Sequence, residues 1–295
     1  MKTVEYIDRA SGRRVAESVM GDKALRFAYE TLLGRTLWPV LFGSKAVSAF
    51  MGRRYDSPKS RKDIAKLAAI PGCRAEEAEK PIGEYSCFNE FFTRRLKPGC
   101  RPVGDGFVSP ADGRLRLFLN ADGLSPFPLK GATRCLFDVF NPSCQMESYP
   151  CDIAVVRLAP VDYHRFHFPY DCKTLRPAET MPGKYHSVNP IALVAYPDVY
   201  ADNERQIVHC EASFGCFTLV DVGAFGVGTI VQTYTGEEHA KGDEKGYFKF
   251  GGSTVIIVTE AGAIKFDDDL VKNSADGFET RVLCGEKIGV PRASD

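Results

Sequence analysis

The sequence lacks an excess of charge of either sign. Among its 295 residues, 38 are Lys or Arg and 38 are Asp or Glu, so the formal net charge is zero. Nonspecific binding to nucleic acid depends on a strongly basic surface that neutralises backbone phosphates. We therefore expect no nucleic-acid partner.

Metal-binding and secretory patterns are also missing. The ten cysteines include no Cys-x-x-Cys or Cys-x-x-His spacing, which structural zinc sites commonly use. The opening MKTVEYIDRASGRR has no apolar core of the kind found in secretory signals. We expect a cytoplasmic protein whose cysteines are reduced thiols.

Long apolar runs are absent as well. The longest stretch without a charged residue, 222–236, contains four glycines, whereas a membrane-spanning helix needs about 20 predominantly apolar residues. We therefore expect no spanning segment. The apolar fraction of 44% and the charged fraction of 26% are typical of a globular chain, and the length allows one or two domains.

The first hundred residues show apolar side chains at helical spacing. Asp22 can cap a first amphipathic helix, which Gly34 can end. The segment 22–54 carries six basic residues against two acidic ones, and it contains Trp38. Such a segment can lie in the plane of an anionic lipid interface, or it can pack on the core as an ordinary amphipathic helix. The expected helices cover about 22–34, 37–51, 57–69 and 88–96.

Beyond Pro98 the pattern changes to short β-branched runs between Gly and Pro turns. We therefore expect an α+β fold, with a helical N-terminal cap over 1–100 and a mostly antiparallel, β-rich catalytic domain over 101–295. The clearest expected strands are 152–158, 216–222, 228–234 and 253–259.

Two of the five histidines, His164 and His167, stand close together in PVDYHRFHFP. Their spacing would suit a metal if further ligands joined them, but no ligand candidate follows at a familiar zinc-protease distance, so we expect no metal. Two imidazoles beside a pocket could instead carry protons, because each titrates near neutrality. They could also simply face solvent in a loop.

A carboxylate and a hydroxyl could join these histidines. Asp112 precedes a glycine in VSPADGR, and Ser253 follows two glycines in KFGGSTV, on a bend that enters an apolar strand. Asp, His and Ser can form a proton relay, and glycines permit the distorted backbone that an internal acyl shift requires. The G-x-S-x-G pattern of many hydrolases is absent. A plain glycine turn before a strand is the alternative.

Three of these segments together resemble phosphatidylserine decarboxylase: SPADGRL, DYHRFHFP and FKFGGSTVI. Three more are similar to that family, namely FNEFFTRRLKPGCRPV, PGKYHSVNPIAL and NERQ. The usual Leu-Gly-Ser-Thr of the family is Gly-Gly-Ser-Thr here, with Gly251 in place of Leu. The resemblance covers the chain from about Phe88 to the strand after Ser253.

The resemblance implies a self-processing enzyme. Asp112, His167 and Ser253 carry over as the cleavage relay, in which His167 takes the hydroxyl proton of Ser253 and the oxygen attacks the Gly252 carbonyl. Cleavage between 252 and 253 gives a β chain, 1–252, and an α chain, 253–295, which stay associated. Ser253 becomes a pyruvoyl group, the self-derived cofactor.

The resemblance also implies the reaction, from phosphatidylserine to phosphatidylethanolamine. A pyruvoyl carbonyl can accept the electrons that remain when CO₂ leaves, which no ordinary side chain can do. His164 carries over as the proton donor, and Ser187 is a candidate pocket-lining residue. The glycine spacing around Gly183 and Gly226 resembles that of hairpins in lipoyl-like barrel-sandwich hybrids. A peripheral position on an anionic membrane surface, held by 22–54, would bring the lipid headgroup to the pocket.

Three alternatives remain at this point. The chain could be a pyruvoyl decarboxylase of a related serine lipid or a small amino acid, or a Ser-His-Asp hydrolase without self-cleavage. It could also be a noncatalytic barrel-sandwich binding module. The sequence leaves open whether the chain forms a homo-oligomer.

Overall fold

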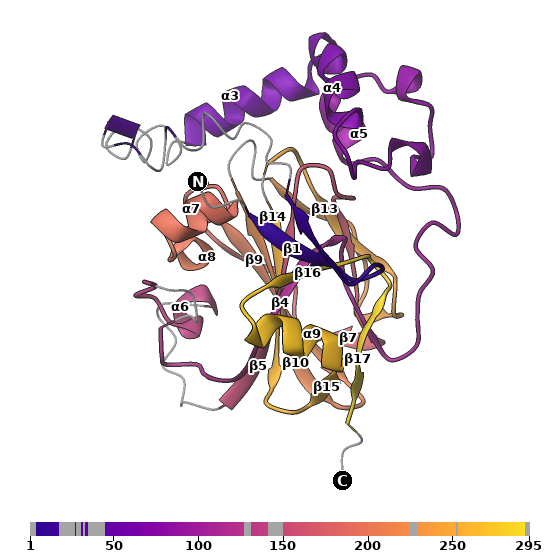
Figure 1. The fold of residues 1–295 in the computed structure, drawn as a ribbon. Coiled ribbons are helices and arrows are strands. Elements are labelled where there is room, and N and C mark those ends of the chain that lie inside the picture. The colour runs from indigo at the N-terminus through magenta and orange to yellow at the C-terminus, as the bar shows by residue number, and fades with distance from the viewer. Residues whose placement is uncertain are drawn as a thin grey trace.

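A large, mostly antiparallel sheet forms the body of the computed structural model (Figure 1). The structure describes residues 4–17, 27, 31, 33–34, 45–126, 131–140, 150–224, 229–251 and 253–292. The strands of the large sheet are β1 (Glu5–Asp8), β2 (Arg13–Ala16), β4 (Gly113–Asp122), β5 (Pro150–Leu158), β7 (Cys172–Thr174), β8 (Glu179–Met181), β9 (Arg205–Ala212), β10 (Gly215–Gly223), β12 (Glu238–His239), β14 (Ser253–Glu260) and β16 (Glu279–Val282).

The strand order is β12-β7-β9-β10-β14-β5-β4-β16-β1-β2, with β8 paired to β9. Only β1 and β16 pair in parallel; every other described ladder of this sheet is antiparallel. The path is open and does not close into a barrel within the described residues.

The central strand β14 is the one that begins at Ser253. Its run of β-branched residues suits a strand covered on both faces, and seven of its eight residues are buried. It pairs with β10 on one side and β5 on the other. Ser253 stands opposite Gly223 in one ladder and opposite Leu158 in the other.

Two small sheets accompany the large one. The first consists of β11 (Ile230–Gln232), β13 (Glu244–Phe248) and β6 (Arg165–His167), and the second of β15 (Ile264–Phe266), β17 (Lys287–Pro291) and β3 (Phe107–Val108). Phe166 and Phe248 share one hydrophobic core with Leu158 and Val255. The first small sheet therefore covers the face of β14 on which position 255 lies.

Short helices cover the opposite face of the large sheet. They are α6 (Leu136–Phe140), α7 (Pro190–Ala195) and α8 (Val199–Asp202). Val139 and Tyr200 pack there against Val222 and Ile256, in a second hydrophobic core. The last helix, α9 (Asp268–Ala275), packs against the first core through Leu270.

The helices before residue 93 lie above one end of the sheets (Figure 1). They are α3 (Lys45–Asp56), the 3₁₀ helices η1 (Pro58–Asp63), η2 (Ala75–Glu77) and η3 (Ile82–Glu84), and the helices α4 (Ile64–Ala68) and α5 (Phe88–Phe92). Phe88, Phe91 and Phe92 are buried in a third core, which reaches the body at Ala159 and Val161. No helix among the described residues is long and apolar enough to span a membrane.

The α+β class and the mostly antiparallel body are confirmed. Each of the four strands expected from β-branched runs is present, as β5, β10, β11 and β14. The expected helical cap is wrong for residues 5–16, which form a hairpin on the edge of the large sheet. Gly12, at φ 67°, supplies its left-handed turn position.

The helix expected over 88–96 ends at Phe92. Leu96 instead forms a bridge with Ala78, which draws the chain away from the helix axis. Most of the expected helix over 22–34 and most of the cluster over 37–51 lie outside the described residues. The boundary near residue 100 between a cap and a catalytic domain stays a prediction.

Candidate active site

Ser253 occupies a fully buried position at the start of β14. Its side chain has no accessible surface, and its Oγ has no hydrogen-bond partner among the described residues. A buried hydroxyl without a partner costs about 1–3 kcal/mol. Most buried polar groups are paired, so a hydroxyl without a described partner keeps Ser253 as the candidate nucleophile. Gly252, the predicted cleavage partner, lies outside the described residues.

The chain leading to Ser253 is held by the helical cap. The backbone N–H of Phe250 donates to Oδ1 of Asn89 at 3.0 Å. The Phe250 ring packs edge-on against Phe92, with ring centroids 5.1 Å apart. The segment before the predicted cleavage point is therefore fixed by α5, from the family-like stretch 88–103.

His164 reaches the same aromatic cluster. Its ring lies 3.9 Å from the ring of Phe92, centroid to centroid. Nδ1 lies 3.0 Å from the carbonyl oxygen of Asp162, so it carries the hydrogen and donates it. Nε2 then presents a lone pair that has no partner among the described residues. Burial lowers the pKa of His164 to about 3, and the imidazole is neutral at physiological pH.

His167 faces a different set of groups. Its Nδ1 donates to the carbonyl of Gly242 at 2.9 Å, and its Nε2 accepts from the hydroxyl of Tyr163 at 3.2 Å. Burial lowers the pKa of His167 as well. Its backbone N–H donates to the carbonyl of Pro110 at 2.8 Å, which ties β6 to the SPADG segment.

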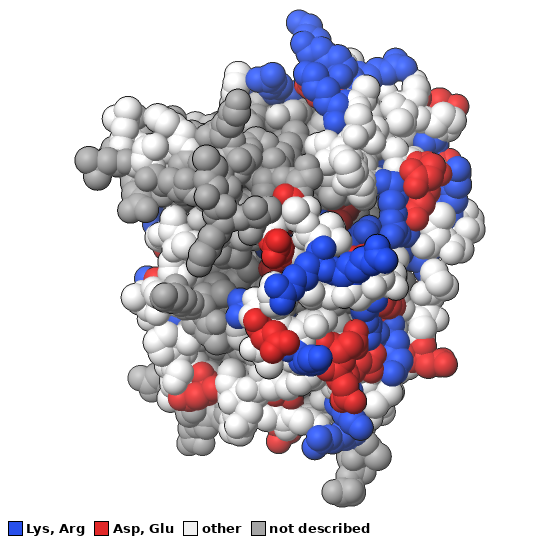
Figure 2. Space-filling view, viewed as in Figure 1, with Lys and Arg blue, Asp and Glu red and all other residues white. Residues whose placement is uncertain are grey.

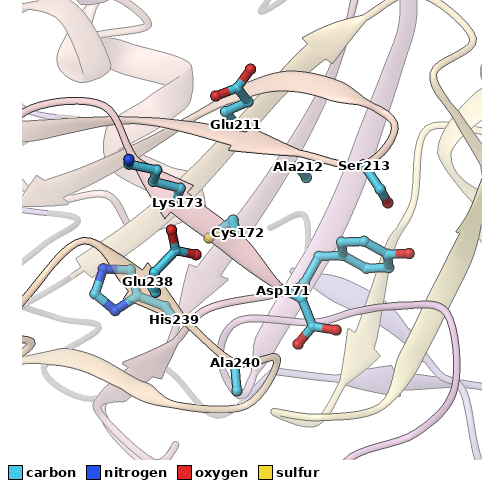
Figure 3. Close-up of a pocket in the computed structure, with 10 residues that line it drawn as sticks. Asp171, Cys172, Lys173, Glu211, Ala212, Ser213, Glu238, His239 and Ala240 are labelled. Atoms are coloured by element: carbon cyan, nitrogen blue, oxygen red, sulfur yellow. The ribbon is translucent and has the colours of Figure 1, made fainter.

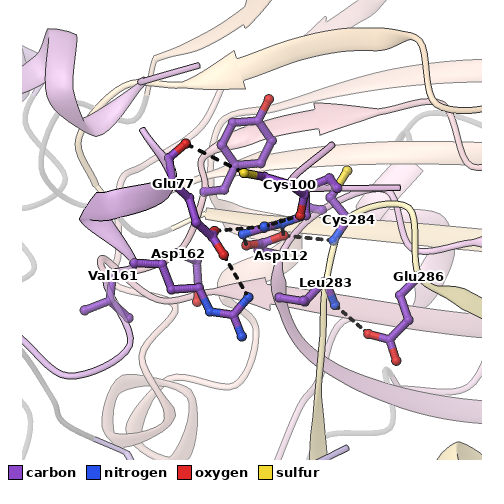
Figure 4. A network of polar contacts seen from close by, with 12 residues as sticks. Glu77, Cys100, Asp112, Val161, Asp162, Leu283, Cys284 and Glu286 are labelled. Carbon is purple, nitrogen blue, oxygen red and sulfur yellow. Dashed lines mark hydrogen bonds and ion pairs between the residues drawn. The ribbon is translucent and has the colours of Figure 1, made fainter. Parts of the chain in front are cut away.

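Asp112 is held by an arginine rather than by a histidine (Figure 4). Its two oxygens accept from Nε and Nη2 of Arg101 at 2.7 and 2.6 Å, and Oδ1 also accepts from the Cys284 backbone N–H at 2.8 Å. Arg101 makes a second ion pair with Glu77 at 2.9 Å. The planar guanidinium matches both carboxylate oxygens at once.

Asp112, His167 and Ser253 therefore do not form a continuous hydrogen-bonded relay in this structure. No hydrogen bond joins Asp112 to His167, or His167 to Ser253, within the described residues. The physical reason is that Arg101 takes up the Asp112 carboxylate while Tyr163 occupies the His167 lone pair. The structure does bring the segments of Asp112 and His167 side by side, through the bond to Pro110.

Ser187, the candidate pocket residue, lies just before α7. It is partly buried, and its Oγ accepts from the backbone N–H of Asn189 at 3.2 Å. Gly183 packs closely, as expected: a Cβ there would stand 2.4 Å from the carbonyl carbon of Asn203. Gly226 lies outside the described residues.

A cavity of about 540 Å³ opens beside His167. Its lining includes Tyr163 and three basic side chains, Arg95, Lys97 and Arg101. Another cavity, of about 610 Å³, lies around Cys172 between β7, β9 and β12 (Figure 3). It contains none of the predicted site residues, so the cavity at His167 is the better candidate for substrate.

The sequence patterns do not single out Arg101 and Tyr163, which contact Asp112 and His167 in the structure. Both stand in the segments that carry the family resemblance, but an Arg or a Tyr in a motif does not reveal which side chain it contacts. No group of three or more His, Cys, Asp or Glu side chains that could hold a metal occurs in the described part of the chain.

Comparison with known proteins identifies the family. The sequence model of the phosphatidylserine decarboxylase family matches residues 88–290. The chain is 38% identical to the phosphatidylserine decarboxylase proenzyme of Chlamydia caviae, over 98% of each chain. It is 38% identical to that of Desulfitobacterium hafniense, over 97% of this chain and 98% of the relative, and 36% identical to that of Fusobacterium nucleatum, over 97% of each. The chain belongs to the phosphatidylserine decarboxylase family.

Proposed function

We propose that the chain is a proenzyme that cuts itself between Gly252 and Ser253 and then converts phosphatidylserine to phosphatidylethanolamine. The observation that carries the proposal is the buried hydroxyl of Ser253, which opens the central strand and has no partner in the part of the chain that the structure describes. The relatives named above are called proenzymes, which supports processing of this chain as well.

Cleavage starts at the Ser253 hydroxyl. Nε2 of His167 exchanges the Tyr163 hydroxyl for that of Ser253 and takes its proton, and the Ser253 oxygen adds to the Gly252 carbonyl. The C–N bond breaks, the nitrogen is protonated, and an ester replaces the amide. Loss of the Ser253 Cα proton then expels Gly252 as a carboxylate and leaves a dehydroalanine. Addition of water releases ammonia and leaves the pyruvoyl group at residue 253.

The fold suits a chain that is cut at this point. The new α chain would begin with β14, which lies between β10 and β5 and has both faces covered. Its ladder bonds and its buried Val255 and Ile256 would hold the two fragments together after the backbone is broken. The pyruvoyl group would stay at the buried end of that strand.

The pyruvoyl group supplies a carbonyl that binds the substrate amine and accepts the electron pair left when CO₂ departs. The residues of the chain handle the proton. Nε2 of His164 carries a lone pair at rest, with no partner among the described residues. We assign to it the relay of one proton, which it takes from solvent that enters with the substrate and delivers to the substrate Cα. It lies against Phe92, beside the chain to Ser253.

The cavity beside His167 supports an anionic lipid headgroup as substrate. Arg95 and Lys97 are exposed at its lining, where they can pair with the phosphodiester. Exposed Lys and Arg side chains also gather over α3 and α4, at the top of the molecule (Figure 2). We assign this end, together with the segment 22–54, to a peripheral position on an anionic membrane.

Intact-mass measurement of purified protein tests the proposal. We expect two chains, 1–252 and 253–295, the second with a pyruvoyl in place of serine at its first residue, and CO₂ release from phosphatidylserine. Ser253→Ala should remain a single, inactive chain, because a methyl group offers neither an attacking oxygen nor a leaving group. An active protein that stays as one unblocked chain would instead support a hydrolase with a permanent serine nucleophile.

A further inference from the structure

Asn203 is a fully buried amide that the mechanism above does not use. It follows α8, and its side chain has no accessible surface. Oδ1 accepts from the His186 backbone N–H at 2.9 Å. Nδ2 donates to two carbonyls, those of His186 and Gly223, each at 2.8 Å. One amide group thus joins two backbone segments that are far apart in the sequence.

The segment that contains Gly223 lies directly beside Ser253. Gly223 is the ladder partner of Ser253. Its N–H donates to the carbonyl of Glu204 at 2.9 Å and its carbonyl accepts from Asn203, so both of its polar backbone groups point away from β14. Gly223 and Ser253 are therefore a pair without mutual hydrogen bonds, and such partners approach to about 4.5 Å between Cα atoms. Asn203 holds the backbone at this close approach.

The segment that contains His186 leads to Ser187. Both backbone groups of His186 are bound by Asn203, which fixes the chain immediately before Ser187. The neighbouring Lys184 strengthens the link, since its N–H donates to Asp202 at 2.8 Å and its carbonyl accepts from Glu204 at 2.9 Å. The 183–187 segment is thereby fastened to the strand next to β14.

We propose that Asn203 is a positioning residue for self-cleavage: it fixes Gly223 against Ser253 and so aims the Ser253 hydroxyl at the peptide bond that is cut. This inference rests on the proposed function. The side chain at position 203 must be an amide, because two carbonyl oxygens accept hydrogen bonds from its nitrogen. A carboxylate of equal size would place an oxygen against both carbonyls and repel them.

The test is the rate of precursor cleavage in Asn203→Asp, followed by gel and mass at a temperature well below the measured Tm of each variant. We expect cleavage to slow at least tenfold. Asn273→Asp is the matched control, since it makes the same charge change and loses one donated hydrogen bond, from Nδ2 to Thr280 at 3.1 Å, on α9. Its precursor should be cut at the wild-type rate.

Hydroxylamine separates positioning from stability. It attacks the ester formed by Ser253, so the amount of fragment ending in a hydroxamate at residue 252 reports how often the hydroxyl has reached the carbonyl. Asn203→Asp should yield at least tenfold less of this product than wild type in the same time. If the variant melts lower but gives wild-type amounts of hydroxamate and cleavage, Asn203 only stabilises the fold and the inference is wrong.

Two further outcomes are decisive. If Asn203→Asp does not fold, Asn203→Ser replaces it, because a hydroxyl can donate to only one carbonyl; intermediate cleavage, about three- to tenfold slow, is expected, and wild-type cleavage would overturn the inference. If wild-type protein and the Asn273→Asp control are themselves uncut, the proposed function fails instead.

Discussion

The guanidinium of Arg101 donates hydrogen bonds to both carboxylate oxygens of Asp112, at 2.7 and 2.6 Å (Figure 4). Both side chains are nearly buried, with 10% and 5% of their surface exposed. The carboxylate is thereby fixed beside the chain that carries His167 without touching the imidazole. Asp112 can support the histidine through its field and by holding the 110–112 segment, which accepts the His167 N–H.

Removing Arg101 should destabilise the precursor strongly. Arg101→Leu leaves a buried carboxylate without its counter-ion, which typically costs about 3–5 kcal/mol. The free energy of unfolding, measured by urea in the uncut Ser253→Ala background, should fall by that order. Arg134→Leu is the control, because the exposed pair of Arg134 with Asp138 at 3.8 Å should contribute less than about 1 kcal/mol. Equal losses in the two variants would contradict the buried-pair assignment.

The two histidines should separate cleavage from turnover. His167→Ala should accumulate uncut precursor, and Asp112→Ala should do so less completely, because the carboxylate only supports the base. His164→Ala should still be cut, yet release CO₂ about 10²- to 10⁴-fold more slowly, the usual contribution of a positioned acid or base. Fragment yield and CO₂ release in each variant measure this. If His164→Ala blocks cleavage while His167→Ala is cut normally, the two roles are reversed.

Burial of neutral His164 should make the precursor less stable in acid. The pKa of His164 is about 3 when folded and about 6.5 when unfolded. Between these values the unfolded chain binds the extra proton, so stability is complete above about pH 6.5 and falls as the pH drops toward 3. We measure the free energy of unfolding by urea in the Ser253→Ala background. His164→Phe should reduce the loss of this free energy below pH 6.5 and leave its pH dependence above pH 6.5 unchanged. An unaltered slope below pH 6.5 would refute the prediction.

Arg95 should contribute to substrate binding and not to processing. Its exposed side chain lines the cavity beside His167. Arg95→Gln should raise KM for phosphatidylserine about 1.4- to fivefold, since an exposed ion pair contributes about 0.2–1 kcal/mol, while kcat and fragment yield stay unchanged. Arg176→Gln, at an exposed position on another cavity, is the control. An unchanged KM in Arg95→Gln would remove this residue from the headgroup site.

The basic end of the molecule should bind anionic vesicles. Arg53 and Arg54 are exposed in the last turn of α3, and a basic residue near an anionic surface contributes about 1 kcal/mol. Sedimentation with anionic vesicles should weaken as salt rises, and the double variant Arg53→Glu and Arg54→Glu should bind at least tenfold more weakly. Lys173→Glu, on β7, should bind as wild type does. Binding that ignores both salt and the double variant would place the membrane contact elsewhere.

Local patterns in the sequence were enough to predict several elements. The β-branched runs became β5, β10, β11 and β14, because a strand with both faces covered requires such side chains along its whole length. Ser253 was expected to open a core strand, and it does. These features depend on residues a few positions apart, so periodicity and turn residues carry the information.

The partners of the site residues were decided by the tertiary structure alone. Asp112 meets Arg101 and not His167, His167 meets Tyr163, and Asn203 joins Gly223 to the segment before Ser187. A motif shows which groups are present, but the hydrogen bonds that a buried group makes depend on which distant segments the sheets and loops bring within about 3 Å. The hairpin at 5–16 follows the same logic, since it gains its place only by pairing with β16, more than 250 residues later in the chain. The sequence by itself determined the family, the candidate serine and the strand that carries it, while the fold decided which side chains surround that serine and the two histidines.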